Sequence, residues 1–325
     1  MTTSVHVRDP RPEAETRLPR GYQARVLEPS PPANCDPDWY ADDPTDPRGA
    51  AGLVVSPTSD GQLSWERLVT ARPELEAFAR DHWLGPRRRL AQLPSSFAAT
   101  RAAGHQAAFF VVSPARHAAT GKLGLRWTRG GFGTPFFGDD EQIRIEGDRL
   151  VVQHRDRVRS QQLTTLIDAA EFVGIPYREP WFEGFHDPPA PAGPDVPLTV
   201  DPAGAAALDD WFGFATAVLE ELRRTRAARD VSRVQLWPEH FDPAVEQGGP
   251  DAGQRASYGA SPGDDAHPEP YLYVAAWGGI DRSDPYWNDT AFNGASLAYA
   301  ELLAADDQYA TALDFLGHGH RRLTG

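Results

Sequence analysis

Apolar residues recur at spacings of three and four in several stretches of the chain, a pattern that predicts amphipathic helices. One such stretch, residues 95–112, begins at the possible N-caps Ser95 and Ser96 and is expected to stop before Pro114. A second covers residues 163–173 and ends at Gly174. The clearest helix lies within residues 205–230, where the predicted buried stripe consists of Leu208, Trp211, Phe212, Ala215, Val218, Leu219 and Leu222. The segment from residue 292 to 320 predicts one or two further helices, the second capped by Asp306.

Strict alternation of apolar and polar residues predicts strands between these helices. "GKLGLRWT" (residues 121–128) places Leu123, Leu125 and Trp127 on one face. "EQIRIEGDRLVVQH" (residues 141–154) predicts a hairpin that turns at Gly147 and Asp148. A second strand-rich block contains "SRVQLWPEHFDPAV", "QRASYGAS" and "PEPYLYVAAW".

The order of these elements predicts an α+β fold, with antiparallel β-sheets in a sandwich-like core and flanking α-helices. Residues 1–61 are rich in Pro and Asp and predict a loosely ordered N-terminal arm. Residues 62–325 predict one α+β domain, with possible subdomains at 62–176 and 205–325 joined by the Pro-rich loop 177–204.

Charge and cysteine content exclude some classes of partner. The formal net charge of −14 disfavours binding to nucleic acid and to anionic lipid, because both need a basic surface. The single cysteine, Cys35, cannot form an internal disulfide, and no run of about 18 apolar residues suggests a membrane span. We therefore expect a soluble, cytoplasmic protein; the sequence does not indicate its oligomeric state.

The best candidate chemistry lies in "LWPEHFDPAV" (residues 236–245). On a regular strand His240 and Asp242 share one face, while Glu239 and Phe241 share the other. Phe241 is then expected in the core, and His240 and Asp242 are the better candidates for two functional residues that act together. In an enzyme His240 would be the general base or a metal ligand, and Asp242 would orient it.

A second acidic segment, "SPGDDAHPEP" (residues 261–270), follows about twenty residues later. If the two segments are neighbours, Asp264, His267 and Glu269 converge on His240 and Asp242. Imidazole and carboxylate groups suit a divalent metal, with His240, Asp242 and His267 as its ligands. No recognised metal-binding spacing occurs, however, and Asp residues in such turns commonly cap backbone N–H groups.

A Gly-rich loop supplies the opposite wall of the expected pocket. Arg126 precedes "RGGFGTP" (residues 129–135), in which Gly131 and Thr134 would approach a ligand closely. The ordinary alternative is a hairpin loop plugged by aromatic residues. The loop matches neither a P-loop nor the dinucleotide-binding Gly pattern. Tyr258 is expected to complete the pocket from the second strand-rich block.

"GKLGLRWTRGGFGTPFF" (residues 121–137), "LWPEHFD", "YGASPGD" and "PEPYLYV" resemble segments of a group of bacterial proteins of unknown function. A more distant likeness is to another family of unknown function, whose "GK" strand leads to a Gly/Thr/Pro loop. The order differs at one point, because "PEP" precedes the Tyr-rich strand here and follows it there. The resemblance implies a shared architecture and no particular activity.

Two functions therefore stand side by side. In the first, the protein binds a small molecule in a polar His/Asp/Glu pocket, and a metal-assisted enzyme is the catalytic form of this hypothesis. In the second, it is a non-catalytic interaction module in which the same polar residues are structural.

Overall fold

The computed structural model describes residues 25–27, 54–58, 61–64 and 89–325, except for 129, 136, 138–140, 155–156, 180, 182–183, 186–187, 224–231, 233 and 249–252. Most of the predicted N-terminal arm therefore lies outside the described residues. Within the first segments, the backbone of β1 (Arg25–Leu27), β2 (Val54–Thr58) and β3 (Gly61–Ser64) forms a three-stranded sheet.

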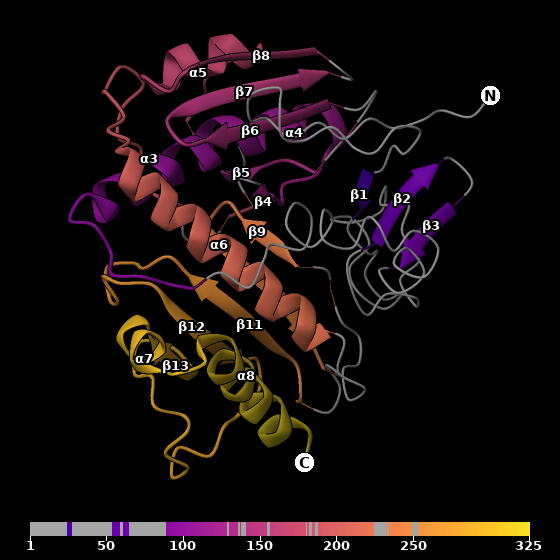
Figure 1. Ribbon diagram of the computed structural model, residues 1–325, viewed down its shortest axis with the longest axis vertical. Helices are drawn as coiled ribbons and strands as arrows, with labels where there is room; N and C mark the ends of the chain where they lie inside the picture. The colour runs from indigo at the N-terminus through magenta and orange to yellow at the C-terminus, as the bar shows by residue number, and fades with distance from the viewer. Residues whose placement is uncertain are drawn as a thin grey trace.

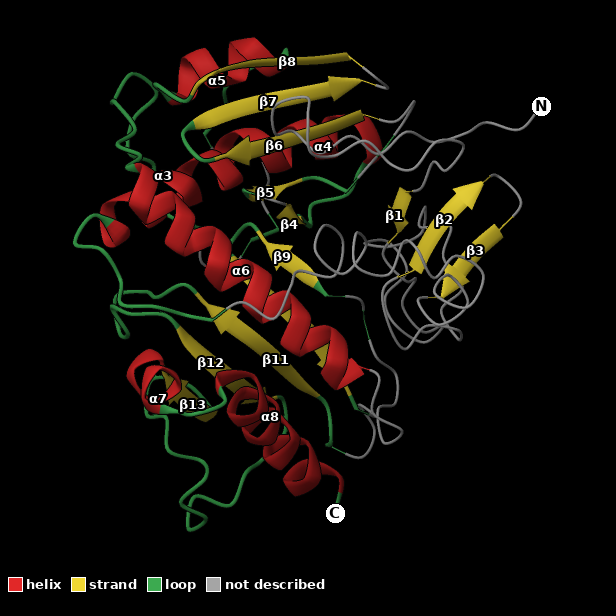
Figure 2. Ribbon diagram, viewed as in Figure 1, coloured by secondary structure: helices red, strands yellow, loops and turns green. Residues whose placement is uncertain are grey.

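Two five-stranded antiparallel sheets and several helices form the rest of the fold, which confirms the predicted α+β class (Figures 1 and 2). The N-terminal sheet is a meander of β4 (Arg126–Thr128), β5 (Gly131–Gly133), β6 (Glu141–Glu146), β7 (Arg149–His154) and β8 (Arg157–Gln162). The C-terminal sheet is a meander of β9 (Gln235–Trp237), β10 (Asp242–Gln247), β11 (Ala256–Ser261), β12 (Tyr271–Ala276) and β13 (Gly294–Ala298).

The two sheets meet at their first strands. Leu125, just before β4, forms a bridge with Leu236 of β9 through two backbone hydrogen bonds of 2.7 and 2.8 Å. Both leucines are buried, which agrees with the predicted inward face of residues 123–127. Strands β4 and β9 therefore face each other across the junction, and a meander extends from each side of it.

Each meander is preceded and followed by helical segments. The first is preceded by α3 (Phe97–Ala107), the π-helical η3 (Ala108–Val112) and α4 (Ser113–Thr120), and is followed by α5 (Leu166–Val173). The second is preceded by α6 (Pro202–Arg223) and followed by α7 (Tyr299–Ala304) and α8 (Gln308–Thr324). Helix α6 contacts β4 and β5 of one sheet and β10 and β11 of the other, and crosses the junction diagonally in Figure 1.

Several local predictions are confirmed. The 141–154 hairpin turns at residues 147–148. Helix α5 has Thr165 as its N-cap and the left-handed Gly174 as its C-cap. The whole predicted stripe of α6, from Leu208 to Leu222, is buried.

Other local predictions are wrong for identifiable reasons. The first helical segment continues past Pro114, because η3 changes the backbone hydrogen-bond pattern just before the proline, which then occupies the first turn of α4. Ser96 makes no side-chain cap; its hydroxyl instead donates to Asp201, 2.7 Å away. Helix α8 is capped by Asp307 rather than Asp306.

The segment "GASLA" (residues 294–298) was expected to be helical and is the edge strand β13. Its partner is β12, with Tyr273 opposite Ser296 and Val274 opposite Ala295. Pairing with an existing sheet therefore overrides the weak helical preference of a short Ala-containing segment.

Candidate functional site

The stretch "LWPEHFD" forms a hairpin turn instead of the continuous strand that the alternation suggested. The Phe241 N–H donates to the Trp237 carbonyl, 2.7 Å away, and Asp242 then pairs with Trp237 at the start of β10. Phe241 has a φ of +56°, which is uncommon for a residue other than Gly, Asn or Asp. The strand-based pairing of His240 with Asp242 is therefore wrong: His240 lies exposed in the turn, while Asp242 is buried in the sheet.

His105 of α3 holds this turn in place. Its Nε2 lies 3.0 Å from the carbonyl oxygens of both Pro238 and Glu239. Because both partners only accept hydrogen bonds, Nε2 must carry the proton. Burial lowers the pKa of His105 to about 4, and the two backbone hydrogen bonds oppose this shift only in part. His105 therefore holds the turn as a neutral imidazole. The sequence pattern did not indicate this role.

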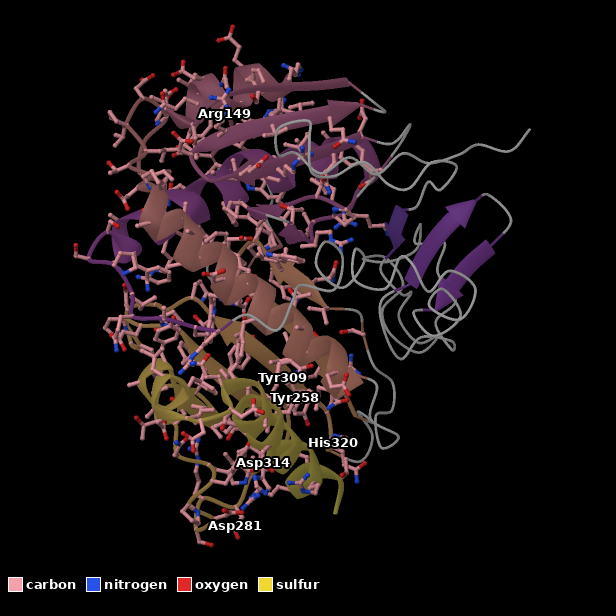
Figure 3. The ribbon with its side chains drawn as sticks, viewed as in Figure 1. Arg149, Tyr258, Asp281, Tyr309, Asp314 and His320 are labelled. Atoms are coloured by element: carbon pink, nitrogen blue, oxygen red, sulfur yellow. The ribbon has the colours of Figure 1, made fainter. Side chains whose placement is uncertain are left out.

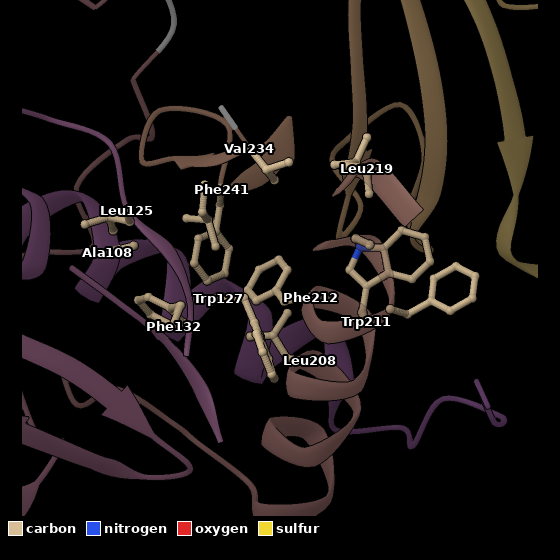
Figure 4. Close-up of a cluster of buried hydrophobic side chains, with 14 of the residues drawn as sticks. Ala108, Leu125, Trp127, Phe132, Leu208, Trp211, Phe212, Leu219, Val234 and Phe241 are labelled. Carbon is tan, nitrogen blue, oxygen red and sulfur yellow. The ribbon is translucent and has the colours of Figure 1, made fainter. Parts of the chain in front are cut away.

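Phe241 points from the turn into the core, as expected (Figure 4). Its ring stacks on His105 with a centroid separation of 5.3 Å. It also meets Phe132 of β5 at 4.9 Å and Phe212 of α6 at 5.1 Å in edge-to-face contacts. These contacts join the turn to both sheets through one aromatic cluster.

One face of the C-terminal sheet carries most of the candidate polar residues, and we call it the polar face. Gly259 pairs with Ala244 on one side and with Tyr273 on the other, and Ser261 pairs with Tyr271. Paired residues on neighbouring strands point to the same face, and along each strand every second residue does so as well. The polar face thus comprises Asp242, Ala244, Glu246, Ser257, Gly259, Ser261, Tyr271, Tyr273, Ala275 and Ser296.

Asp242 lies at one end of the polar face, and only one of its two carboxyl oxygens has a hydrogen-bond partner among the described residues. The Tyr273 hydroxyl donates a hydrogen bond to Asp242 Oδ2. Asp242 Oδ1 is buried and has no hydrogen-bond partner among the residues that the structure describes. Burial raises the pKa of Asp242, and the charge of His240 and the bond from Tyr273 only partly oppose it. A buried acceptor without a donor is rare in native proteins and calls for an explanation.

Glycine at position 259 makes the contact between Tyr273 and Asp242 possible. A Cβ added to Gly259 would overlap the ring and hydroxyl of Tyr273. The tyrosine therefore crosses β11 close to the backbone and reaches Asp242 on β10. Burial, together with the neighbouring Asp242, raises the pKa of Tyr273 well above its ordinary value, so the phenol keeps its proton.

The loop between β11 and β12 brings a second carboxylate to the same end of the sheet. The Tyr271 hydroxyl donates to Asp264 Oδ2 at 2.6 Å, and the backbone N–H groups of Ala266 and His267 donate to Oδ1 at 2.8 Å each. Partial burial alone would raise the pKa of Asp264, but these hydrogen bonds outweigh it and the pKa is lowered. Arg101 of α3 fixes the loop by donating to the carbonyl of Pro268 at 3.0 Å.

His267 covers Tyr271 at the edge of this group. The two ring centroids are 4.3 Å apart. His267 Nε2 lies 3.0 Å from Asp289 Oδ2, an ion-pair distance, although the geometry does not qualify as a hydrogen bond. The structure therefore brings Asp264 and His267 to the same end of the sheet as Asp242, while His240 lies in the turn before β10.

The remaining predicted residues lie elsewhere. Tyr258 projects from the opposite face of β11, where it is buried beside His320 of α8 at a ring-centroid distance of 6.3 Å (Figure 3). It faces the helices because neighbours along a strand point to opposite sides. Glu269 is exposed and lines a separate cleft of about 330 Å³ beside α7.

Arg126, Gly131 and Thr134 belong to the N-terminal sheet. Arg126 lies on β4, with its Nε donating to the carbonyl of Trp127 at 3.2 Å. Gly131 pairs with Glu146 in the β5–β6 ladder. Thr134 Oγ1 accepts a hydrogen bond from the backbone N–H of Ile143 at 3.1 Å. The last two contacts match the hairpin alternative considered for this loop.

No group of three or more His, Cys, Asp or Glu side chains within the described part of the chain is arranged to hold a metal ion. His240, Asp242 and His267 therefore do not form the expected metal centre. A search of the described helices also finds none long and apolar enough to cross a membrane.

The geometry of the polar face thus rests on a buried, half-bonded Asp242, two tyrosines and a loop that carries Asp264 and His267. Comparison with known proteins adds no relative: no protein-family model, no curated protein and no solved structure matches this chain.

Proposed function

We propose that this protein binds a small polar ligand on the polar face, with Asp242 as the central contact. The observation that carries the proposal is the buried Asp242 carboxyl, which has Oδ2 bonded to Tyr273 and Oδ1 without a partner among the described residues. Because Oδ1 is buried, a ligand N–H or O–H group would donate to it after Tyr273 or the turn before β10 moves aside.

The energetic argument follows from the cost of burial. A buried acceptor that lacks a donor costs about 1–3 kcal/mol, and a ligand donor would remove that cost. Tyr273 supports this role because its hydroxyl orients the carboxyl, while Gly259 lets the tyrosine lie close to the sheet. Tyr271, two residues before Tyr273 on β12, orients Asp264 in the same manner.

The opposite pKa shifts of two carboxyls favour a catalytic version as a second candidate. Burial raises the pKa of Asp242, whereas hydrogen bonds lower that of Asp264. Two carboxyls whose pKa values are pushed apart are the usual arrangement for a general acid and a general base. Asp242 would then be the acid and Asp264 the base, in place of the His240 base expected from the sequence.

Replacement of Asp242 by Asn tests the binding site. A library of small polar compounds is screened for those that raise the melting temperature of the protein. Their dissociation constants are then measured by calorimetry. Loss of a hydrogen bond to a carboxylate is expected to weaken such binding by about tenfold to a hundredfold in Asp242→Asn.

Asp265→Asn is the matched control, because Asp265 is an exposed acid in the adjoining loop. It should leave binding unchanged. Ligands that bind Asp242→Asn as tightly as the unchanged protein would reject the site and would favour the interaction-module alternative.

Metal analysis of the purified protein tests whether a divalent ion takes part. We expect the same metal content in the unchanged protein, in His240→Ala and in Asp242→Ala, because no metal-binding group is found among the described residues. Stoichiometric metal that disappears in both variants would overturn the metal-free form of the proposal.

A further inference from the structure

Trp277 is the most exposed large hydrophobic residue in the described part of the chain. Its exposed fraction is 59%, compared with 47% for Val196 and 40% for Ile167. Tryptophan is usually mostly buried, so an exposed indole next to a polar sheet face is a candidate for part of a binding surface.

Trp277 directly follows β12 and continues the polar face beyond the end of that strand. It follows Tyr271, Tyr273 and Ala275 at every second position, so it projects on the same side. Its backbone N–H donates to the carbonyl of Arg255 at 3.0 Å, and its indole Nε1 donates to Ser257 Oγ at 3.0 Å. The indole therefore leans across β11, as Tyr273 does further along the same strand.

The inner side of the Trp277 ring covers an ion pair. Arg255 Cζ lies 4.9 Å from the ring centroid, and Arg255 Nη2 lies 2.6 Å from Glu246 Oε2. The Arg255 side chain is only 10% exposed, whereas Trp277 is 59% exposed. The indole is thus held in place from below while much of its surface stays in contact with solvent.

Tyr273 is a second supported ring at the other end of this surface. It lies against Gly259 and contacts Phe292 at a centroid distance of 6.0 Å. Tyr273 lies on β12 and Trp277 directly follows that strand four residues later, a separation of about 13 Å for extended chain. The positions between them carry the small residues Ser257, Ala275 and Gly294.

We propose that the surface between Tyr273 and Trp277 binds a linear, neutral oligosaccharide. This inference rests on the proposed function, because the end of the sugar chain nearest Tyr273 would donate a hydroxyl hydrogen bond to Asp242. Sugar rings have apolar faces that stack on aromatic rings and hydroxyl groups that donate to carboxylates. The spacing of the two rings suits a chain of several sugar units.

The charges around the surface favour a sugar over an anionic polymer. The guanidinium of Arg255 is already paired with Glu246, and the Asp242 end of the surface carries Asp264 as well. A nucleic acid would need basic groups for its phosphates, and the chain as a whole has a net charge of −14. Hydroxyl donors, in contrast, match carboxylate, phenol and serine acceptors.

The test uses the full chain and calorimetric titration with cellohexaose, xylohexaose and maltohexaose, together with spermine as a cationic probe. At least one hexasaccharide should bind, and Trp277→Ala should weaken that binding by about tenfold or more. Trp277→Phe keeps a flat ring and should restore most of the affinity. Ile167→Ala, at an exposed apolar residue of α5, is the control and should bind like the unchanged protein.

Melting temperatures of all variants separate lost binding from lost folding. Failure of all three hexasaccharides to bind would overturn the proposal, as would binding that is unaffected in Trp277→Ala. Spermine binding that depends on Trp277, without any sugar binding, would also overturn it in favour of a cationic ligand.

Asp242→Asn distinguishes the two proposals. If Trp277→Ala weakens sugar binding and Asp242→Asn does not, the aromatic surface stands and the Asp242 contact fails. If compounds from the small-molecule screen require Asp242 and no hexasaccharide binds, the proposed function stands and the oligosaccharide is wrong.

Discussion

Replacing Phe241 with Ala is expected to lower the free energy of unfolding by about 3–5 kcal/mol, the usual effect of removing a buried aromatic side chain. Phe241 is 1% exposed and contacts His105, Phe132 and Phe212. Its loss would leave a cavity where α3, α6 and the N-terminal sheet meet. Urea denaturation followed by tryptophan fluorescence measures the change.

Phe241→Gly separates the packing effect from the backbone effect. With a φ of +56°, Ala at this position keeps the left-handed strain of about 1–2 kcal/mol, whereas Gly relieves it. We therefore expect Phe241→Gly to be as stable as Phe241→Ala or more stable, although Gly is the smaller residue. A glycine variant clearly less stable than the alanine variant would contradict the left-handed turn.

Acidification is expected to destabilise the protein by about 3 kcal/mol through His105 alone. The pKa of His105 is about 4 in the folded protein, below the ordinary value of 6.5. Between these two pH values the unfolded chain binds a proton that the folded protein does not. The contribution of His105 to the free energy of unfolding is therefore greatest above pH 6.5. It falls by about 1.4 kcal/mol per pH unit below pH 6.5 and stops falling near pH 4.

His105→Phe isolates this contribution. The variant retains a ring against Phe241 but loses the donor to the Pro238 and Glu239 carbonyls. It should be less stable at pH 7 and should lose about 3 kcal/mol less than the unchanged protein between pH 7 and pH 4. His318→Gln, at a half-exposed histidine of α8, is the control and should retain the full pH dependence. Equal pH dependence in the unchanged protein and His105→Phe would show that His105 is not the cause.

The sequence predicted those elements whose pattern is local. Alternation identified Leu125 and Trp127 as inward-facing, and the helix that ends at Gly174 has the left-handed C-cap that glycine favours. Prediction failed where a distant partner decides the structure. Residues 294–298 become a strand only because β12 offers an edge, and the turn at Pro238 depends on His105, which is more than a hundred residues away.

The candidate site was predictable in part. The proximity of Asp242 to the Asp264 loop followed from two consecutive strand segments, β10 and β11, pairing as neighbours. Tyr258 was misplaced because "ASYGAS" gives no clear indication of which face meets the helices. Tyr271 and Tyr273 were missed, although their spacing of two residues in "YLYV" already placed them on one face.

The Leu125–Leu236 bridge has a consequence for solubility. The first strand of each meander would otherwise present unpaired backbone N–H and C=O groups, which are templates for aggregation. At the junction the backbone groups of Leu125 and Leu236 bond to each other, so they are not left unpaired. Each half of the chain therefore acts as the edge cover of the other, and either half produced alone would present a bare strand edge to its neighbours in solution.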